Sequence, residues 1–250
     1  MERGGFLASN YSNLYRIKQE IRERVWRRME EEGIAIFPRP VYGRIPNFRG
    51  HEAAAARLMK HDLFRRTKVV FCCPDSPQRP VREGALRSGK LLIMASPRLR
   101  SGFLILDPKK IPPSLYRRAS TIRGAFSLGD KVEFPAEKID LKVTGSVAVS
   151  VDGGRVGKGG GFSDLEYAIL RELGVVDDDT PVVTTVHEVQ IVNFVPMTAH
   201  DVPIDYIFTP SRTIKTRGAY TKPKGIIWEE LDHRKLEEIP ILRRLAERRR

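Results

Sequence analysis

The first half of the chain contains a short apolar segment, a helical pattern and a second apolar segment in direct succession. Lys68–Cys73 is rich in strand-forming residues and stops at the turn cluster Pro74–Pro77. Val81–Arg87 predicts a helix with Gly89 just past its end, and Lys90–Ala95 predicts the next strand. This alternation is typical of a parallel sheet covered by helices, so we expect an α/β fold.

The rest of the chain continues the alternation. Val143–Val151 predicts another strand, and Ser163–Leu173 predicts a helix that Gly174 closes. A short helix is expected over Pro112–Thr121. We expect the remaining strands at Phe103–Leu106, Val182–Val186, Ile204–Phe208 and, at an edge of the sheet, Arg212–Thr216.

An amphipathic helix precedes the first strand. Leu14–Glu32 predicts this helix, with Asn13 as a candidate N-cap and Gly33 at its end. Lys18 and Arg22 are four residues apart and project from one face beside the apolar stripe. The stripe consists of residues at spacings of three and four, namely Leu14, Ile17, Ile21, Val25 and Met29.

Two different segments connect this helix to the first strand. Phe37–Gly50 carries three prolines and predicts an extended arm. Glu52–Lys60 contains four consecutive alanines and predicts a second helix.

Length and composition fit one large domain. The 250 residues, of which 41% are apolar, are enough for a sizeable core. We expect a single α/β domain over residues 1–225, with the helix and the proline-rich arm in residues 1–50, present as a monomer or a homodimer. Residues 226–250 are expected to form a charged helical tail that is solvated or frayed.

The chain is expected to be cytoplasmic and not to associate with membranes. No segment approaches the roughly 20 apolar residues that a membrane span needs, and Met1–Asn10 has no apolar signal region. Cys72 and Cys73 are adjacent, and neighbouring cysteines rarely form a disulfide. Two cysteines without a second pair or a spaced histidine also give no zinc site.

The formal net charge of +13 suggests nucleic acid as a partner. The basic residues, however, are spread along the chain among 31 acidic ones, and no RNP1-like, KH-like or zinc-finger pattern occurs. A solvated basic surface is therefore favoured over a nucleic-acid-binding face, and such a surface also attracts small anionic ligands.

A glycine-rich segment, Arg155–Asp164, lies between a predicted strand and a predicted helix. Glycines allow backbone N–H groups to turn toward one point, and the helix that follows adds the positive end of its dipole. Arg155 and Lys158 add full positive charges. The segment therefore predicts a phosphate-binding loop, although it is not a Walker A sequence. A mobile glycine-rich hairpin turn is the alternative.

Acidic residues near this loop are candidate metal ligands. Asp164 either caps the helix or binds a magnesium ion together with phosphates. His200, Asp201 and Asp205 precede a predicted strand and either complete such a site or form an ordinary turn.

The order of these motifs resembles the 5-formyltetrahydrofolate cyclo-ligase family. Lys18–Arg22 matches the family's Lys-x-x-Leu-Arg, and Arg155–Asp164 matches its Arg-x-Gly-x-Gly-x-Gly-Tyr-Tyr-Asp loop. Glu188–Gln190 matches a Glu-x-Gln element, and His200–Asp205 matches His-Asp-x-x-x-Asp. Segments such as Pro97–Gly102 are similar to a divergent branch that includes the methenyltetrahydrofolate synthetase domain-containing proteins.

The resemblance implies a three-layer α/β/α fold with a mostly parallel sheet, and the cofactors ATP and Mg²⁺. It implies Asp164 and Asp201 as metal ligands, and Arg155, Lys158 and Asp164 as catalytic residues. The implied reaction converts 5-formyltetrahydrofolate to 5,10-methenyltetrahydrofolate. The implied nucleotide-binding residues are Lys18, Arg22, Arg155, Gly157, Lys158, Gly159, Gly160, Gly161, Phe162 and Ser163.

The substrate side departs from the family pattern. Gln78 stands where members usually have a folate-binding glutamate, Phe162 and Ser163 replace two tyrosines, and Leu165 stands where many have arginine. Other hypotheses therefore remain, namely a different substrate related to thiamine, or a non-catalytic module that binds nucleotide or RNA. The expected substrate contacts are Cys73, Gln78, Arg79 and Arg82. Arg98 and Arg100 are expected to join Arg79 and Arg82 in a pocket that binds an anion.

Overall fold

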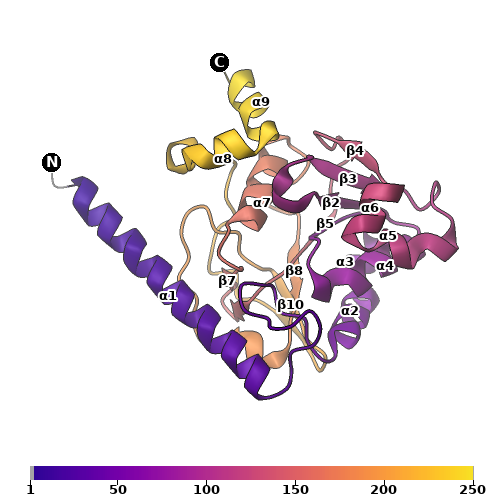
Figure 1. Cartoon of the computed structure of the whole chain (residues 1–250), viewed down its shortest axis with the longest axis horizontal. Coiled ribbons are helices and arrows are strands. Elements are labelled where there is room, and N and C mark those ends of the chain that lie inside the picture. The colour runs from indigo at the N-terminus through magenta and orange to yellow at the C-terminus, as the bar shows by residue number, and fades with distance from the viewer. Residues whose placement is uncertain (1–2, 250) are drawn as a thin grey trace.

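The computed structural model describes residues 3–249, and within them the chain forms an eight-stranded sheet (Figure 1). Its strand order is β11-β10-β8-β5-β1-β2-β3-β4. The five strands from β10 to β2 are parallel, whereas β11, β3 and β4 are antiparallel to their neighbours. The strands are β1 Val69–Cys72, β2 Leu91–Ala95, β3 Phe103–Leu106, β4 Asp130–Val132, β5 Leu141–Thr144, β8 Val182–Thr185, β10 Tyr206–Phe208 and β11 Thr213–Lys215.

Helices cover both faces of this sheet, which confirms the predicted three-layer α/β/α fold. One face carries α2 His51–Lys60, α3 Asp62–Arg66, α4 Arg79–Arg87, α5 Tyr116–Ala119 and α6 Ile122–Leu128, and the other carries α7 Phe162–Glu172 and α9 Pro240–Arg248. Alternate side chains of β1 point to opposite faces of the sheet. Val70 and Cys72 pack against the helices from α2 to α6, and Phe71 packs against α7 and α9.

The segment predicted as one strand over Val143–Val151 is two strands in different sheets. β5 ends at Thr144, and β6 (Ala148–Ser150) belongs to a three-stranded sheet. At Gly145 the backbone passes so close to the arm that a Cβ would lie 2.8 Å from Cγ2 of Ile45. The chain therefore leaves the large sheet there. The small sheet has the order β7-β6-β9, with β7 Arg155–Val156 and β9 Ile191–Val192.

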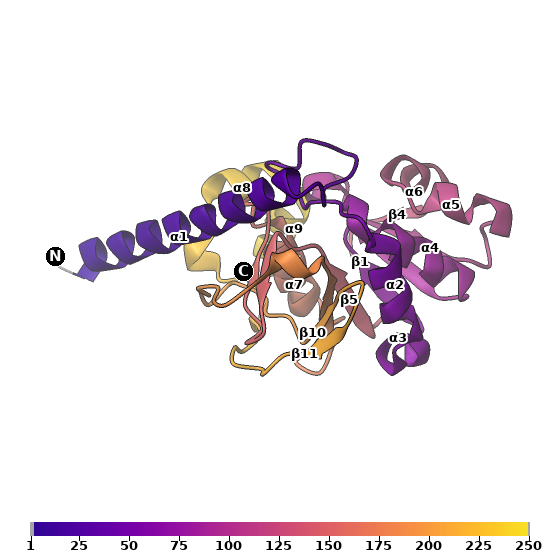
Figure 2. The same ribbon diagram turned by 90° about the horizontal axis from the view of Figure 1, so that it is seen from below.

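The first helix, α1, runs from Arg3 to Glu31 and so begins before the expected residue. Asn13 lies inside it rather than capping it, while Gly33 has a φ of 63° just past the last turn, as its predicted role requires. The buried stripe, including Ile21 and Val25, packs on the small sheet. The N-terminal turns extend beyond the rest of the molecule (Figure 2).

The proline-rich arm, predicted to be extended, forms a series of bends and turns. An isolated bridge between Ala35 and Phe48 closes it, and the side chains of Val41 and Phe48 are fully buried. The arm returns toward the large sheet and brings Gly43 and Ile45 to the ends of its strands.

The C-terminal segment is helical but not solvated or frayed, so that prediction was wrong. It contains α8 (His233–Glu238) and α9, which lie beside α7 (Figure 1). Its apolar side chains pack into the same cluster as α7, because their spacing gives α9 one apolar face. The division of the chain at residue 225 stays a prediction, and its outer limits, residues 1 and 250, lie outside the described residues. The buried apolar residues of this C-terminal segment are Ile226, Ile239, Ile241, Leu242 and Leu245.

Within residues 3–249, no helix has both the length and the apolar character needed to cross a bilayer.

Candidate active site

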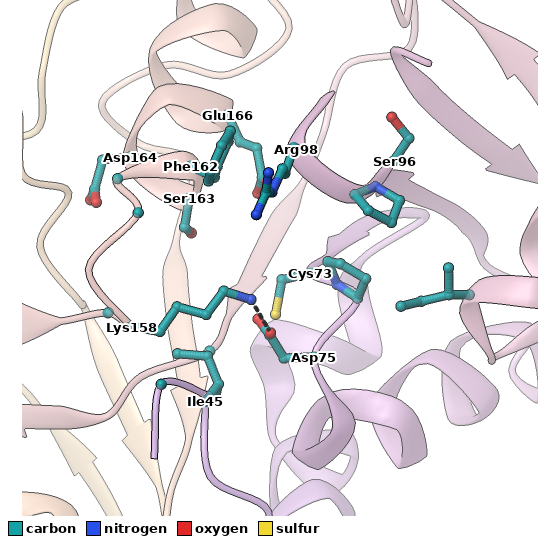
Figure 3. Close-up of a pocket in the computed structure, with 18 of the residues that line it drawn as sticks. Ile45, Cys73, Asp75, Ser96, Arg98, Lys158, Phe162, Ser163, Asp164 and Glu166 are labelled. Carbon is teal, nitrogen blue, oxygen red and sulfur yellow. Dashed lines mark hydrogen bonds and ion pairs between the residues drawn. The ribbon is translucent and has the colours of Figure 1, made fainter. Parts of the chain in front are cut away.

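A cavity of about 460 Å³ lies at the carboxyl ends of β1, β2 and β5 (Figure 3). Strand order reverses between β1 and β5, and this is where open α/β sheets bind ligands. Three segments that follow strands meet there: Cys73–Asp75 after β1, Ser96–Arg98 after β2, and Gly145 after β5. The glycine-rich loop and the start of α7 form the opposite wall.

The backbone of the loop explains why glycines are needed. Gly159 has a φ of 106° and Gly161 a φ of 66°, which is left-handed backbone that other residues adopt at a cost. Gly161 is the N-cap of α7 and provides no side chain for its first N–H groups. These groups therefore remain available to an anion at the positive end of the helix.

Arg155 and Asp164 close the loop at its two ends. Nη2 of Arg155 lies 2.5 Å from Oδ1 of Asp164, and Nη1 donates to the carbonyl of Gly145 at 3.1 Å. The backbone N–H of Val202 donates to the same Oδ1 at 3.0 Å. Burial alone would raise the pKa of Asp164, but the guanidinium and the Val202 N–H offset burial and hold that pKa below its ordinary value.

Helix α1 holds the loop from outside the cavity. Nζ of Lys18 pairs with Oδ2 of Asp201 at 2.5 Å, and Nε of Arg22 donates to the carbonyl of Gly157 at 2.7 Å. The Asp201 carboxylate also accepts from the backbone and hydroxyl of Thr198. The structure thus brings the predicted residues from three distant segments together around the loop, although Lys18, Arg22 and Asp201 do not line the cavity itself.

Lys158 is the cation of the loop that can move. Its side chain is 47% exposed, and Nζ pairs with Oδ1 of Asp75 at 3.1 Å across the cavity (Figure 3). Next to it, the Ser163 hydroxyl lies 2.6 Å from the hydroxyl of Thr144 and ties the start of α7 to β5. Phe162 lines the cavity, as do Gly157, Gly160 and Gly161.

Of the four expected substrate contacts, Cys73 alone lines the cavity. Burial raises the pKa of its thiol well above the ordinary value, so the thiol is neutral. Gln78 is fully buried, and its amide donates to the carbonyl and hydroxyl of Thr185. These bonds turn Gln78 into the core, away from the cavity.

The predicted arginine pocket does not form as one unit. Arg82 is 2% exposed and donates to the carbonyls of Cys73, Asp75 and Ser120, so it supports the segment after β1. Arg79 bonds to the hydroxyl of Ser120 and lines a separate depression with Glu83. Arg98 does line the cavity, with a φ of 56° that is strained for a non-glycine residue, and Arg100 does not.

Three charged residues of the site were missed by sequence reasoning. Asp75 stands in a segment that reads as a plain turn, and Glu166 lies two residues after the loop motif. Lys142 interrupts the buried strand β5. A charged residue inside an apolar strand was the sequence signal that could have identified it as part of the site. Nζ of Lys142 lies 3.9 Å from Oε2 of Glu166, and both atoms are buried without a hydrogen bond to any residue from 3 to 249.

The acidic side chains do not form a complete metal site by themselves. No group of three histidine, cysteine, aspartate or glutamate side chains in the described part of the chain is placed to hold an ion. Mg²⁺ is usually held by one or two carboxylates and by substrate phosphates, so this arrangement fits a nucleotide-bound magnesium ion. Asp164 would be its ligand, because it lines the cavity and Arg155 and Val202 both contact the same oxygen, Oδ1, whereas Asp201 does not line the cavity.

Comparison with known proteins agrees with this geometry. Residues 15–210 match the model of the 5-formyltetrahydrofolate cyclo-ligase family, and the chain therefore belongs to that family. The NMR structure of Aquifex aeolicus 5,10-methenyltetrahydrofolate synthetase has the same fold. It superposes with a TM-score of 0.50 at 21% identity, over 82% of this chain and 95% of that one.

The chain is also similar to the methenyltetrahydrofolate synthase domain-containing proteins of mammals. It is 43% identical to that of Mus musculus over 92% of this chain and 63% of the relative. It is 42% identical to that of Homo sapiens over 92% of this chain and 62% of the relative. This chain thus spans less than two thirds of the length of either relative.

Proposed function

We propose that the cavity is the active site of an ATP- and Mg²⁺-dependent ligase of the cyclo-ligase type, with 5-formyltetrahydrofolate as substrate. The observation that carries this proposal is the meeting of two features in one cavity. The cationic glycine loop forms one wall, and the carboxyl ends of three strands form the other. One ligand with phosphates and a second, organic ligand can therefore lie side by side.

The loop provides the phosphate side of this site. Backbone N–H groups at the start of α7 donate hydrogen bonds to phosphate oxygens, and Lys158 leaves Asp75 to pair with a phosphate. Arg155 is 2% exposed and keeps its bonds to Asp164 and Gly145, so it acts through charge and by holding the loop in shape. Bound Mg²⁺ would neutralise phosphate charge beside Asp164.

The proposed reaction demands positioning more than a dedicated base. The formyl oxygen attacks the terminal phosphorus of ATP, a new P–O bond forms, and the bond from that phosphorus to ADP breaks. A second folate nitrogen then attacks the formyl carbon and loses its proton. The C–O bond breaks, phosphate leaves with the former formyl oxygen, and the methenyl group remains. A rigid site that holds both ligands and stabilises charge on phosphate oxygens suits this sequence.

A turnover assay tests the proposal. The purified chain with ATP, Mg²⁺ and 5-formyltetrahydrofolate should form the methenyl product, which is followed by its absorbance. Omission of ATP should abolish the signal. If no product forms at high protein concentration while ATP still binds, the substrate assignment is wrong and a different substrate, such as a thiamine-related one, takes its place.

The RNA-binding hypothesis has no comparable support. The four arginines of the predicted pocket lie in different surroundings. The depression beside Arg79 contains Glu52 and Glu83 together with Arg87 and Arg117. A gel shift that is unchanged in Lys158→Ala and Asp164→Ala would favour RNA binding over catalysis.

A further inference from the structure

Glu166 stands out among the residues of the cavity because its buried Oε2 has no hydrogen-bond donor among residues 3–249. It lies in the first half of α7, its side chain extends toward the interior of the cavity (Figure 3), and the residue is 6% exposed. The atom nearest to this Oε2 among the cationic groups is Nζ of Lys142, at 3.9 Å. A buried acceptor without a donor is unfavourable, and native structures keep few such groups.

Lys142 lies behind Glu166 and does not fill the gap. Nζ is 3.9 Å from Oε2 of Glu166, which is an electrostatic contact but too long for a hydrogen bond. The ammonium group also lies over the ring of Phe71, 4.4 Å from its centre. Lys142 therefore fixes where the carboxyl group lies and leaves its acceptor capacity to a ligand.

We infer that Glu166, backed by Lys142, determines substrate specificity by accepting a hydrogen bond from an N–H group on a heterocyclic substrate. This inference rests on the proposed function and names the class of substrate for the same cavity. The class consists of heterocycles with an amino group or a ring N–H, such as the pteridine of a folate or an aminopyrimidine.

The part of the cavity beside Glu166 does not favour a small anionic ligand. Cations lie on other parts of the wall, at Lys158 on the loop and Arg98 after β2. A ligand that fills the cavity therefore meets carboxyl groups as well as cations. A small phosphorylated acid gives the Glu166 carboxyl group no hydrogen-bond donor, whereas an N–H group does.

Calorimetric titration of two compounds tests the inference and distinguishes a folate ligand from an aminopyrimidine ligand. The compounds are 5-formyltetrahydrofolate and 4-amino-5-hydroxymethyl-2-methylpyrimidine, each without ATP, with ATP titrated separately. Glu166→Leu should weaken binding of the preferred heterocycle by about tenfold or more and leave ATP affinity unchanged. Glu172→Gln, at the exposed end of the same helix, is the matched control.

The double variant Lys142→Met/Glu166→Leu protects the test against misfolding, because apolar replacement of a whole buried pair is often tolerated. It should lose heterocycle affinity as Glu166→Leu does. Unchanged heterocycle affinity in both variants, an equal loss of ATP affinity, or no binding of either compound by the wild type would overturn the inference. Binding of the pyrimidine alone would support it and refute the folate assignment. If the protein turns over 5-formyltetrahydrofolate but Glu166→Leu binds it with wild-type affinity, the proposed function holds and the inference about Glu166 is wrong.

Discussion

Arg155 and Asp164, the first and last residues of the glycine-rich loop, form a buried ion pair with 2.5 Å between Nη2 and Oδ1. The loop is therefore closed at its base by a contact within the protein. Its N–H groups are held in place before a phosphate arrives, and this lowers the cost of ordering them on binding.

Loss of this pair should destabilise the whole domain. Asp164→Asn leaves the Arg155 guanidinium, which is 2% exposed, without its anion. Breaking one side of a buried pair costs about 3–5 kcal/mol of unfolding free energy. Urea unfolding measures this loss. Asp130→Asn breaks the exposed pair with Lys110 and should cause no measurable change. Equal losses of unfolding free energy in the two variants would show that the Arg155–Asp164 pair contributes no more to stability than an exposed pair.

Lys158 should matter for nucleotide binding and not for folding. Its side chain is 47% exposed, and its ion-pair partner, Asp75, lies across the cavity. Lys158→Ala should leave the melting temperature unchanged and weaken ATP binding about tenfold or more. The remaining binding should depend less on salt, because one charge contact is gone. Wild-type ATP affinity in Lys158→Ala would remove this residue from the site.

Gly161 should be needed both for backbone conformation and for ligand binding. Its φ is 66°, and Gly174 at the other end of α7 has a similar φ of 71° in open space. An alanine in left-handed backbone costs about 1–2 kcal/mol, so Gly161→Ala and Gly174→Ala should lose similar stability in denaturant titrations. Gly161→Ala alone should also weaken ATP binding. A similar loss of ATP affinity in Gly174→Ala would show that the effect is indirect.

Glu166 should make the protein less stable as pH rises through neutrality. Burial raises its pKa from the ordinary 4.5 to about 7 in the folded state. Between these values the folded state keeps a proton that the unfolded state has lost. The stabilisation is therefore complete below pH 4.5 and disappears as pH rises through 7. Glu166→Gln should flatten this fall between pH 5 and 8 in chemical denaturation, whereas parallel curves for variant and wild type would show that Glu166 is ionised throughout.

The C-terminal helix α9 should be an integral part of the core. Leu242 is fully buried in the cluster that contains α7. Leu242→Ala should cost about 2–5 kcal/mol, measured by urea unfolding. Arg243→Ala, at the exposed neighbouring position, is the control and should have little effect. A small effect of Leu242→Ala would restore the expectation of a frayed tail.

The fold could be predicted because buried parallel strands appear in the sequence as short apolar segments between helical patterns. β1, β2 and β8 were found in this way. The break after β5 was not, because Gly145 ends the strand through the approach of Ile45 from the distant arm. Likewise, the apolar face of α9 was hidden among many charged residues, and only its contact with α7 shows that it is buried.

The position of the glycine-rich loop in the cavity could be predicted from the sequence better than the position of the expected substrate contacts. The loop and its flanking charges are contiguous, so the sequence alone shows that they lie together. The substrate side depends on contacts between distant residues. Gln78 faces Thr185 in the core, and the carboxyl group in the cavity comes from Glu166 on another element. No spacing rule connects Glu166 with Lys142, because they meet only in the folded chain.

The transfer of one oxygen atom tests the proposed function most directly. If the terminal phosphoryl group of ATP is transferred to the formyl oxygen, that oxygen leaves in phosphate. 5-Formyltetrahydrofolate labelled with ¹⁸O in the formyl group, incubated with the protein, ATP and Mg²⁺, should give one labelled oxygen in each phosphate released. Mass spectrometry of the phosphate measures it. Methenyl product formed with unlabelled phosphate, or ATP hydrolysis without folate turnover, would contradict the proposed reaction.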